Sequence, residues 1–275
     1  MRADMHIHSV YWDGLYSPDE GCRIAKSRGL GFISITDHDT MNGDEVKREA
    51  AKKYGVGYVS GWEVSAYASK QKVHVLGYGC ERGEAYAAFM EKRKTAALER
   101  AEYSAERFRE LGVPVTLEEI LNERADKSAP VHTMHIARVA GRYLGMQEGD
   151  VYLQYLARGK PANAPFGRPT PEEAIDCIHA SGGVASIAHP GRIMMHTKKR
   201  EKLIRRLAEY GVDGIEAVYT THTEEEKAYY IGLAKELGLF VTGGSDTHCE
   251  EGSPAVIGQP CFIPDEKLVE RLLKR

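Results

Sequence analysis

The chain has no long apolar segment. No hydrophobic run approaches the roughly 20 residues that a helix needs to cross a bilayer, and the first residues have the pattern of a strand rather than that of a signal peptide. The sequence therefore predicts neither a membrane span nor export. We expect a cytoplasmic protein.

Cysteine is sparse and the net charge is small. The five cysteines are scattered, odd in number and include no Cys-x-x-Cys pair, so the sequence indicates reduced thiols rather than a disulfide framework. A net charge of −3 excludes a general attraction to nucleic acid or to an anionic membrane. No DNA-binding platform is evident, and the sequence does not indicate the oligomeric state.

Short apolar runs alternate with helical patterns along most of the chain, whose 42% hydrophobic and 28% charged residues are typical of a globular enzyme. Each run is bounded by glycine, proline or polar residues, which favours buried parallel strands. Capping boxes at Ser17 and Thr170, each followed by proline, predict two of the intervening helix starts. Seven strands in β-α order favour a barrel-like α/β fold over an open sheet. The runs are Ala3–His8, Phe32–Thr36, Gly57–Trp62, Val73–Tyr78, Val184–Ala188, Gly214–Val218 and Phe240–Thr242.

One long segment breaks this alternation. Residues 83–164 have helical patterns throughout, so we expect two domains: a barrel of residues 1–82 and 165–275, and a helical insertion of residues 83–164. The insertion either caps the barrel or acts as a lid that contacts substrate. The lid is favoured because His135 and Arg138 lie one turn apart on one predicted helical face.

Histidines and acidic residues gather near the ends of the predicted strands. His6 and His8 alternate along one strand, so both side chains point to one face and form a natural metal clamp. Asp4 shares that face and is placed to orient an imidazole. The ends of barrel strands meet at one mouth, where distant ligands converge on a multinuclear metal site. The other members are Asp13, Asp37-His38-Asp39, Glu63, His74, His189 and Asp246-Thr247-His248.

Together these motifs resemble those of the PHP (polymerase and histidinol phosphatase) family. The resemblance is carried by Asp4-x-His6-x-His8, Thr36-Asp37-His38-Asp39, Glu63, His74, His189-Pro190-Gly191 and Ser245-Asp246-x-His248. It implies a distorted (β/α)7, TIM-like barrel with an all-helical insertion. It also implies two to three divalent transition metals, with manganese placed before iron or zinc.

The insertion is similar to the branch of the family that holds nucleoside 3′,5′-bisphosphate phosphatases and 5′-3′ exoribonucleases. Met134–Arg138 and Gly159-Lys160-Pro161 carry this similarity. One departure concerns phosphate recognition. The Arg-Thr pair that precedes the corresponding histidine in related phosphatases is not reproduced, because His132-Thr133-Met134 precedes His135 here.

Carried across residue by residue, the resemblance assigns three groups of metal ligands. The first metal is held by His6, His8, Glu63 and Asp246; the second by Glu63 as a bridge, His74 and His189; the third by Asp13, His38 and His248. Of these, Asp13, His38 and His248 are also expected to serve catalysis. Asp37 is expected to support the site without binding metal.

Such a site predicts a hydrolase that cleaves phosphate esters with a metal-activated hydroxide. Arg138 and Arg192 are expected to grip phosphate in catalysis, because a guanidinium fork matches its oxygens, and His135 is expected to contact substrate. The expected substrate is a small phosphorylated nucleotide, such as a 3′,5′-bisphosphonucleotide, or the 5′ end of a phosphorylated RNA. Two alternatives stay open: a phosphatase of histidinol phosphate or another small phosphomonoester, and a non-catalytic metal-binding regulatory module.

Overall fold

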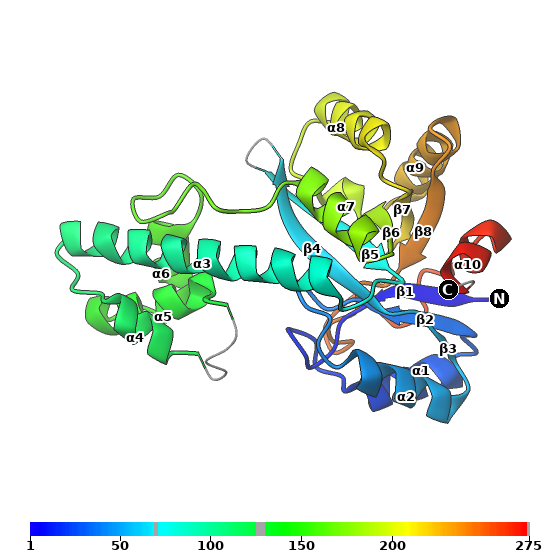
Figure 1. Ribbon diagram of the computed structural model, residues 1–275, viewed down its shortest axis with the longest axis horizontal. Helices are drawn as coiled ribbons and strands as arrows, with labels where there is room; N and C mark the ends of the chain where they lie inside the picture. The colour runs from blue at the N-terminus through cyan, green and yellow to red at the C-terminus, as the bar shows by residue number, and fades with distance from the viewer. Residues whose placement is uncertain (69–70, 125–129, 274–275) are drawn as a thin grey trace. The chain divides into compact units, whose positions relative to one another are not determined.

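The computed structural model describes residues 1–68, 71–124 and 130–273 (Figure 1). Its contacts divide the chain into two compact units. Unit 1 comprises Met1–Tyr86 and Pro169–Arg275, and unit 2 comprises Ala87–Arg168. Among the described helices, none is both long enough and apolar enough to cross a membrane.

The described strands of unit 1 form two sheets (Figure 1). The first sheet is parallel, in the order β1-β2-β3, and the second has the order β4-β5-β6-β7-β8. The first contains β1 (Ala3–Ile7), β2 (Phe32–Ile35) and β3 (Gly57–Tyr58). The second contains β4 (Gly61–Ala68), β5 (Gln71–Tyr78), β6 (Val184–Ile187), β7 (Gly214–Tyr219) and β8 (Phe240–Gly244).

The second sheet departs from the expected β-α alternation. Strands β4 and β5 are antiparallel neighbours, and β5 is also antiparallel to β6, so only β6, β7 and β8 pair in parallel there. The prediction of one parallel strand over residues 57–62 was wrong, because this segment is divided between β3 and β4. Only two residues separate Ala68 from Gln71, which is too few for the crossover that parallel neighbours require.

Single bridges link the two sheets at two places. Ile7 bridges Thr247 beyond β8, and His38 beyond β2 bridges Glu63 on β4. The sheets also share buried apolar residues, among them Met5 and Leu76. The described residues thus form an α/β fold of two joined sheets, and a continuous closed barrel is not found in their hydrogen bonding.

Helices surround these sheets, and local chemistry explains several of their starts. Ser17, Thr170 and Thr223 each close a capping box with a glutamate three residues later, which satisfies amides at the helix N-termini. The described helices of unit 1 are α1 (Pro18–Ser27), α2 (Asp44–Tyr54), α7 (Pro171–Ala180), the short η2 (Pro190–Arg192), α8 (Thr197–Tyr210), α9 (Glu224–Glu236) and α10 (Glu266–Leu273).

The regular elements among the described residues of unit 2 are all helices, and the unit has its own apolar core. Phe108, Ile120, Val139 and Leu156 are buried together in it, which explains how the insertion forms a compact unit. Its helices are α3 (Glu84–Glu110), which begins in unit 1, α4 (Leu117–Asn122), α5 (Thr133–Leu144), α6 (Glu148–Val151) and the π-helix η1 (Tyr152–Leu156).

Candidate metal centre

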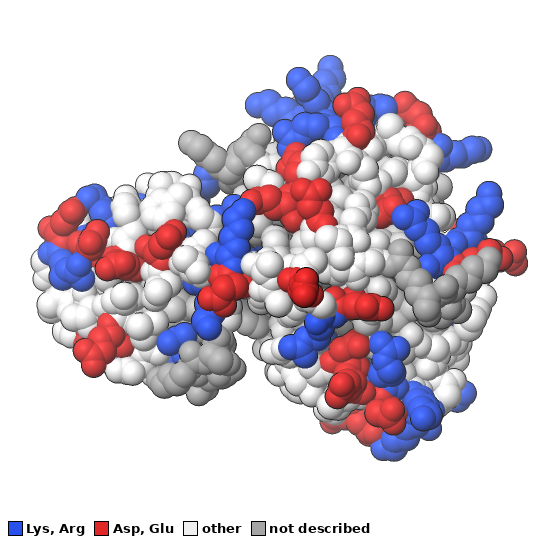
Figure 2. All heavy atoms as spheres, in the orientation of Figure 1, with Lys and Arg blue, Asp and Glu red and all other residues white. Residues whose placement is uncertain are grey.

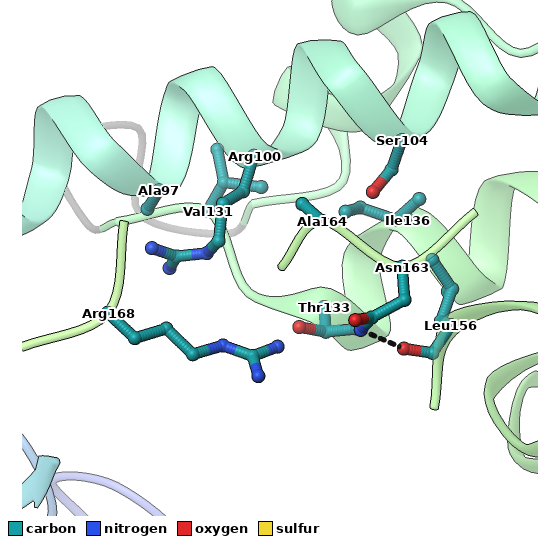
Figure 3. Close-up of a pocket in the computed structure, with 10 residues that line it drawn as sticks. All are labelled: Ala97, Arg100, Ser104, Val131, Thr133, Ile136, Leu156, Asn163, Ala164 and Arg168. Carbon is teal, nitrogen blue, oxygen red and sulfur yellow. Dashed lines mark hydrogen bonds between the residues drawn. The ribbon is translucent and has the colours of Figure 1, made fainter. Parts of the chain in front are cut away.

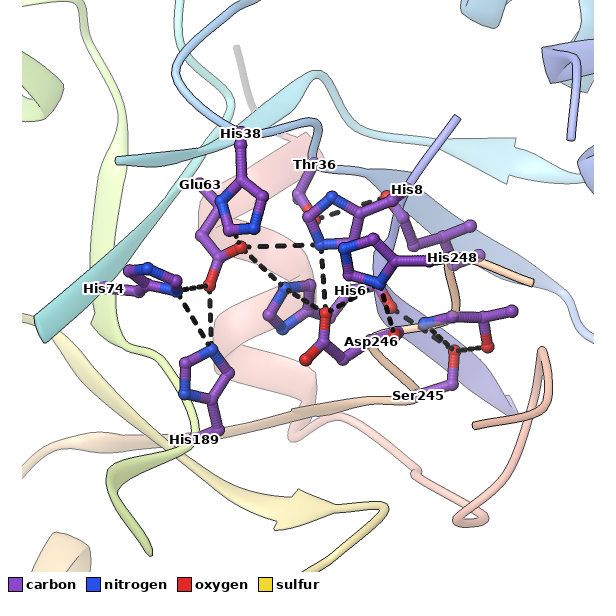
Figure 4. Close-up of polar contacts among 12 residues, drawn as sticks. His6, His8, Thr36, His38, Glu63, His74, His189, Ser245, Asp246 and His248 are labelled. Carbon is purple, nitrogen blue, oxygen red and sulfur yellow. Dashed lines mark hydrogen bonds and ion pairs between the residues drawn. The ribbon is translucent and has the colours of Figure 1, made fainter. Parts of the chain in front are cut away.

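Histidine and acidic side chains from both sheets converge in unit 1 (Figure 4). His6, Glu63 and His74 lie on β1, β4 and β5. His8 directly follows β1, and the remaining members lie in the segments after β1, β2, β6 and β8. These are Asp13, His38, His189, Asp246 and His248. Residues more than 200 positions apart in the sequence therefore meet in one cluster.

Three overlapping groups in this cluster could each hold a metal ion. Within each group, one ligand atom from every member lies within 4.8 Å of the others. The groups are His6, His8, Glu63 and Asp246; His8, Asp13, His38 and His248; and His38, Glu63 and His74. His189 joins the last of these, since its Nε2 lies 2.8 Å from Oε1 of Glu63 and 3.3 Å from Nδ1 of His74.

The donor atoms of the cluster fit metal ions. Buried polar atoms normally have hydrogen-bond partners, and exceptions need an explanation. Here several atoms that face the cluster are buried without a hydrogen bond. They are Nε2 of His6, both ring nitrogens of His8, Nδ1 of His38, Oε2 of Glu63 and Oδ1 of Asp246. Mixed imidazole and carboxylate donors of this kind suit divalent transition metals.

The cluster strongly perturbs the ionisation of its members. Burial raises the pKa of Glu63, but the imidazoles of His38 and His74 outweigh it and hold this pKa well below its usual range. Burial likewise opposes ionisation of Asp246, yet His6 keeps its pKa low. His74 responds differently: burial dominates and lowers its pKa to about 3. A neutral His74 ring and ionised carboxylates are the protonation states that metal ligation requires.

Strained backbone occurs at the same cluster. His189 and Asp246 are non-glycine residues with positive φ angles of 24° and 56°. Such a conformation costs on the order of 1–3 kcal/mol and persists only where the surrounding structure enforces it. Two contacts hold the turn at His189. Its amide donates to Oε2 of Glu216 at 2.7 Å, and the amide of Gly191 donates to Nε2 of His222 at 3.1 Å.

Two residues of β7 that the sequence motifs did not indicate, Glu216 and Tyr219, support the predicted ligands. Glu216 is fully buried on β7, with Oε1 2.9 Å from Nδ1 of His6. Tyr219, at the end of the same strand, donates its hydroxyl to Oδ2 of Asp246 at 2.8 Å. The signal available in the sequence was a lone acid inside the apolar run Gly214–Val218, since an unpaired carboxylate is costly to bury.

Asp4 does not orient an imidazole as we had expected. Its carboxylate accepts backbone amides instead, from Gly258 at 2.7 Å, Ser245 at 2.9 Å and His6 at 3.2 Å. Asp4 therefore fixes the backbone between β1 and the segment after β8, while Glu216 contacts the ring of His6. Side-chain alternation along a strand gives the face of a residue but not its partner.

The predicted phosphate-binding residues occupy two different environments. Arg192 lies at the metal cluster, where its guanidinium donates to the hydroxyl of Tyr219 at 2.8 Å and to Oδ2 of Asp246 at 3.2 Å. Its side chain is 59% exposed. His135 and Arg138 lie on α5 in unit 2, where Nε of Arg138 is 2.9 Å from Oε2 of Glu148.

Unit 2 has a small cavity of about 20 Å³ that neither His135 nor Arg138 lines (Figure 3). The side chains of Arg100 and Arg168 border it together with the hydroxyl of Thr133. Its volume corresponds to about one water molecule. The remaining lining residues are Ala97, Ser104, Val131, Ile136, Leu156, Asn163 and Ala164.

Comparisons with known proteins give a consistent result. Residues 4–148 match the PHP domain family. The chain is 31% identical over 251 residues to the 5′-3′ exoribonuclease Rnm of Escherichia coli (strain K12), covering 89% of this chain and 84% of that protein. It is 30% identical over 267 residues to the 3′,5′-nucleoside bisphosphate phosphatase of Chromobacterium violaceum, covering 96% and 93% of the two chains.

A further relative has another substrate in its name. The phosphoribosyl 1,2-cyclic phosphate 1,2-diphosphodiesterase of Eggerthella lenta is 31% identical over 267 residues, covering 94% of this chain and 98% of that protein. Among solved structures, an amidohydrolase from Chromobacterium violaceum with bound sulfate superimposes with a TM-score of 0.75 at 26% identity. That match covers 99% of this chain and 98% of the other.

Proposed function

This chain belongs to the PHP domain family and is a metal-dependent hydrolase of phosphate esters, and on that premise we propose that its substrate is a nucleotide. The substrate is a 3′,5′-bisphosphonucleotide or the 5′ end of a phosphorylated RNA, cleaved at a phosphomonoester or a phosphodiester bond. We further propose that the two sheets are the halves of a distorted PHP barrel.

The observation that carries the metal-dependent hydrolysis in this proposal is the position of the Glu63 carboxylate. Its Oε2 lies 2.8 Å from Nδ1 of His38, 3.3 Å from Nε2 of His6 and 3.4 Å from Nε2 of His8. A single buried carboxylate oxygen is thus shared by imidazoles from two strand ends. If metals bind here, a carboxylate in this position would serve as a ligand to more than one of them, because its two oxygens offer several lone pairs.

The metal ligands in this proposal are those that the family resemblance assigns, so His8 and His38, which each belong to two of the three groups, would each bind one ion. His6, His8, Glu63 and Asp246 would hold one ion, Glu63, His74 and His189 a second, and Asp13, His38 and His248 a third, with manganese placed before iron or zinc. When bound, such ions supply an activated water and stabilise the negative charge that develops on the phosphoryl oxygens.

The chain's own residues orient the substrate around this cluster. Arg192 reaches the cluster from its exposed rim and presents a guanidinium fork, which pairs with two phosphate oxygens at once. Tyr219 ties Arg192 to Asp246 through its hydroxyl. A phosphate that enters would take over the contacts of Arg192 while Tyr219 continues to hold Asp246.

The preference for a nucleotide is supported by the relatives named above. Two relatives are named for RNA or for nucleoside bisphosphates, substrates that carry a phosphate besides the one attacked. His135 and Arg138 of unit 2 remain proposed substrate contacts.

The test compares substrates at equal concentration with manganese-loaded protein. The panel contains adenosine 3′,5′-bisphosphate, a 5′-phosphorylated RNA oligomer, AMP, histidinol phosphate and a five-membered cyclic ribose phosphodiester. Released phosphate and shortened RNA are both measured. His38→Ala is the inactive control, because this ring belongs to two of the three groups.

Preference for the bisphosphate or the RNA end, lost in His38→Ala, supports the nucleotide assignment. Preference for histidinol phosphate or the cyclic diester contradicts the nucleotide assignment, although the protein would still be a phosphoesterase. Absence of turnover with every substrate, despite bound manganese, would favour a non-catalytic metal-binding module.

A further inference from the structure

Lys47 on α2 is buried although it is not a member of the metal cluster. Its side chain is only 1% exposed, and its Nζ lies 2.5 Å from Oδ2 of Asp37. The ring of Tyr11 lies over the same ammonium, with its centroid 5.5 Å from Nζ. Burying an ammonium group is costly unless it is paired. The pair with Asp37 therefore calls for a structural or functional reason.

The partner carboxylate holds the start of the turn that follows β1. Oδ1 of Asp37 accepts the amide of Ser9 at 2.6 Å, and Oδ2 accepts the hydroxyl of Ser9 at 2.8 Å. Ser9 in turn closes the loop, because its carbonyl accepts the amides of Trp12 at 3.1 Å and Gly14 at 3.0 Å. A Cβ at Gly14 would lie 2.5 Å from the carbonyl carbon of His8, so the turn cannot accommodate a side chain at this position.

This turn carries Asp13 into the second of the three groups, formed by His8, Asp13, His38 and His248. Oδ2 of Asp13 lies 3.4 Å from Nε2 of His248 and 3.9 Å from Nε2 of His38, and Oδ1 lies 3.6 Å from Nδ1 of His8. The side chain of Asp13 is 43% exposed, whereas those of His6, His8 and Glu63 are fully buried. Packing alone therefore does not fix this carboxylate.

Asp37 also directly precedes His38, another member of the same group. Its backbone carbonyl accepts the amide of Glu63 at 3.1 Å, which continues the bridge between the sheets. One carboxylate thus controls the loop of Asp13 through Ser9 and lies beside His38 in the chain. Lys47 is the cation that holds this carboxylate in place.

We propose that Lys47 is a positioning residue for a single metal site. Through Asp37 and Ser9 it sets Asp13, which belongs to only one group, and so determines the affinity of the group His8, Asp13, His38 and His248 for its ion. The other two groups do not contain Asp13. This inference rests on the proposed function in one respect, that this group holds a metal.

The experiment is a manganese titration of the full-length, metal-stripped chain, with bound metal also counted by elemental analysis. Lys47→Met is compared with wild type and with Asp13→Asn, which removes a ligand of the group directly. The matched control is Lys53→Met. Lys53 lies on the same helix, and its Nζ lies 2.5 Å from Oδ1 of Asp19, which is not a member of the cluster. Circular dichroism checks that each variant is folded.

In Lys47→Met the affinity of one manganese site should fall at least tenfold, as in Asp13→Asn, while the remaining sites bind as in wild type. Hydrogen exchange at the amides of Trp12 and Gly14 should accelerate in the same variant. Lys53→Met should behave as wild type in both measurements. Unchanged affinity of all sites in folded Lys47→Met overturns the proposal, and so does an equal loss at every site.

A second variant covers the case in which Lys47→Met does not fold. Lys47→Met/Asp37→Asn removes both charges and keeps an oxygen acceptor for the amide of Ser9. Weakened binding at one site in the double variant supports the proposal, and wild-type binding contradicts it. If Asp13→Asn binds manganese as wild type does, the assignment of a metal to this group is wrong. That outcome is distinguishable from a failure of the role proposed for Lys47, in which Asp13→Asn loses affinity at one site and Lys47→Met does not.

Discussion

Nδ1 of His6 lies 2.9 Å from Oε1 of Glu216, although 210 residues separate the two in sequence. Both side chains are fully buried. A carboxylate at this distance favours Nδ1–H as the donor, so that the Nε2 lone pair would be available to a metal ion beside Glu63 and Asp246. The same carboxylate holds the amide of His189.

Glu216→Gln should weaken metal binding without removing a ligand. An amide keeps the size of the side chain but loses the charge that favours the Nδ1–H tautomer. Loss of such an outer partner typically costs about 10–100-fold in metal affinity. The measurement is a manganese titration, with the exposed Glu209→Gln as control. Equal dissociation constants in Glu216→Gln and wild type would falsify this role.

Arg192→Ala should raise KM more than it lowers kcat. Arg192 is half-exposed at the rim of the cluster, and a hydrogen bond to a charged group contributes about 1.5–3 kcal/mol, so a rise in KM of roughly tenfold or more is expected. Steady-state kinetics on the preferred substrate give both parameters. The control is Arg206→Ala, whose side chain pairs with Glu172 on the surface. A similar rise in KM in both variants would show that loss of positive charge in general, rather than the position of Arg192, raises KM.

The metal-free protein should become less stable as the pH rises above about 6.5. Burial opposes protonation of His6 and His8, but the surrounding carboxylates outweigh it and raise both pKa values. A raised folded-state pKa contributes stability that is complete below the unfolded pKa of about 6.5 and is lost as pH rises through the folded pKa. Glu63 and Asp246 have lowered pKa values, so their contribution is constant above about pH 5.

Metal binding should show the opposite dependence on pH. Ions bind only unprotonated imidazoles, so manganese affinity should increase between pH 6 and 9 while the Tm of the chelator-treated protein decreases. Thermal unfolding with chelator and with manganese, at several pH values, measures both trends. Adding manganese should raise Tm most at the alkaline end. A Tm of the metal-free protein that increases steadily from pH 6 to 9 would contradict the assignment.

Substitution of the lysines on α8 should impair turnover of RNA more than turnover of a mononucleotide. Figure 2 shows Lys and Arg side chains gathered over this helix, and its first turn has no acidic residue. Arg200 donates to the carbonyl oxygens of Pro190 and Gly191, which places the start of α8 beside the His189 turn. Replacing Lys198, Lys199 and Lys202 by glutamate should raise KM for the RNA oligomer and reduce its salt dependence.

The internal control for these lysine variants is the bisphosphonucleotide. Its turnover should change little, because a mononucleotide is too short to follow α8 away from the cluster. Parallel loss with both substrates would point to a disturbed metal centre rather than to a lost RNA contact. An unchanged KM for RNA would show that α8 does not contact the RNA substrate.

The sequence by itself determined the family, the chemical type of the site and most of the local structure. Histidines and acids at the ends of apolar runs pointed to a metal centre, and the comparisons confirmed the family that these motifs resemble. Capping boxes at Ser17 and Thr170 lie where they were expected. These features are readable because capping and strand alternation depend on residues a few positions apart.

Only the tertiary structure decided how the cluster is supported. Glu216 reaches His6 and Lys47 reaches Asp37 through contacts between elements, and Asp4 binds backbone amides rather than a ring. The antiparallel pairing of β4 and β5 belongs with these corrections. The physical reason is shared by all of them: a buried polar group must find a partner, but its local sequence pattern gives only its burial and its face, and the fold selects the partner from distant strands and helices.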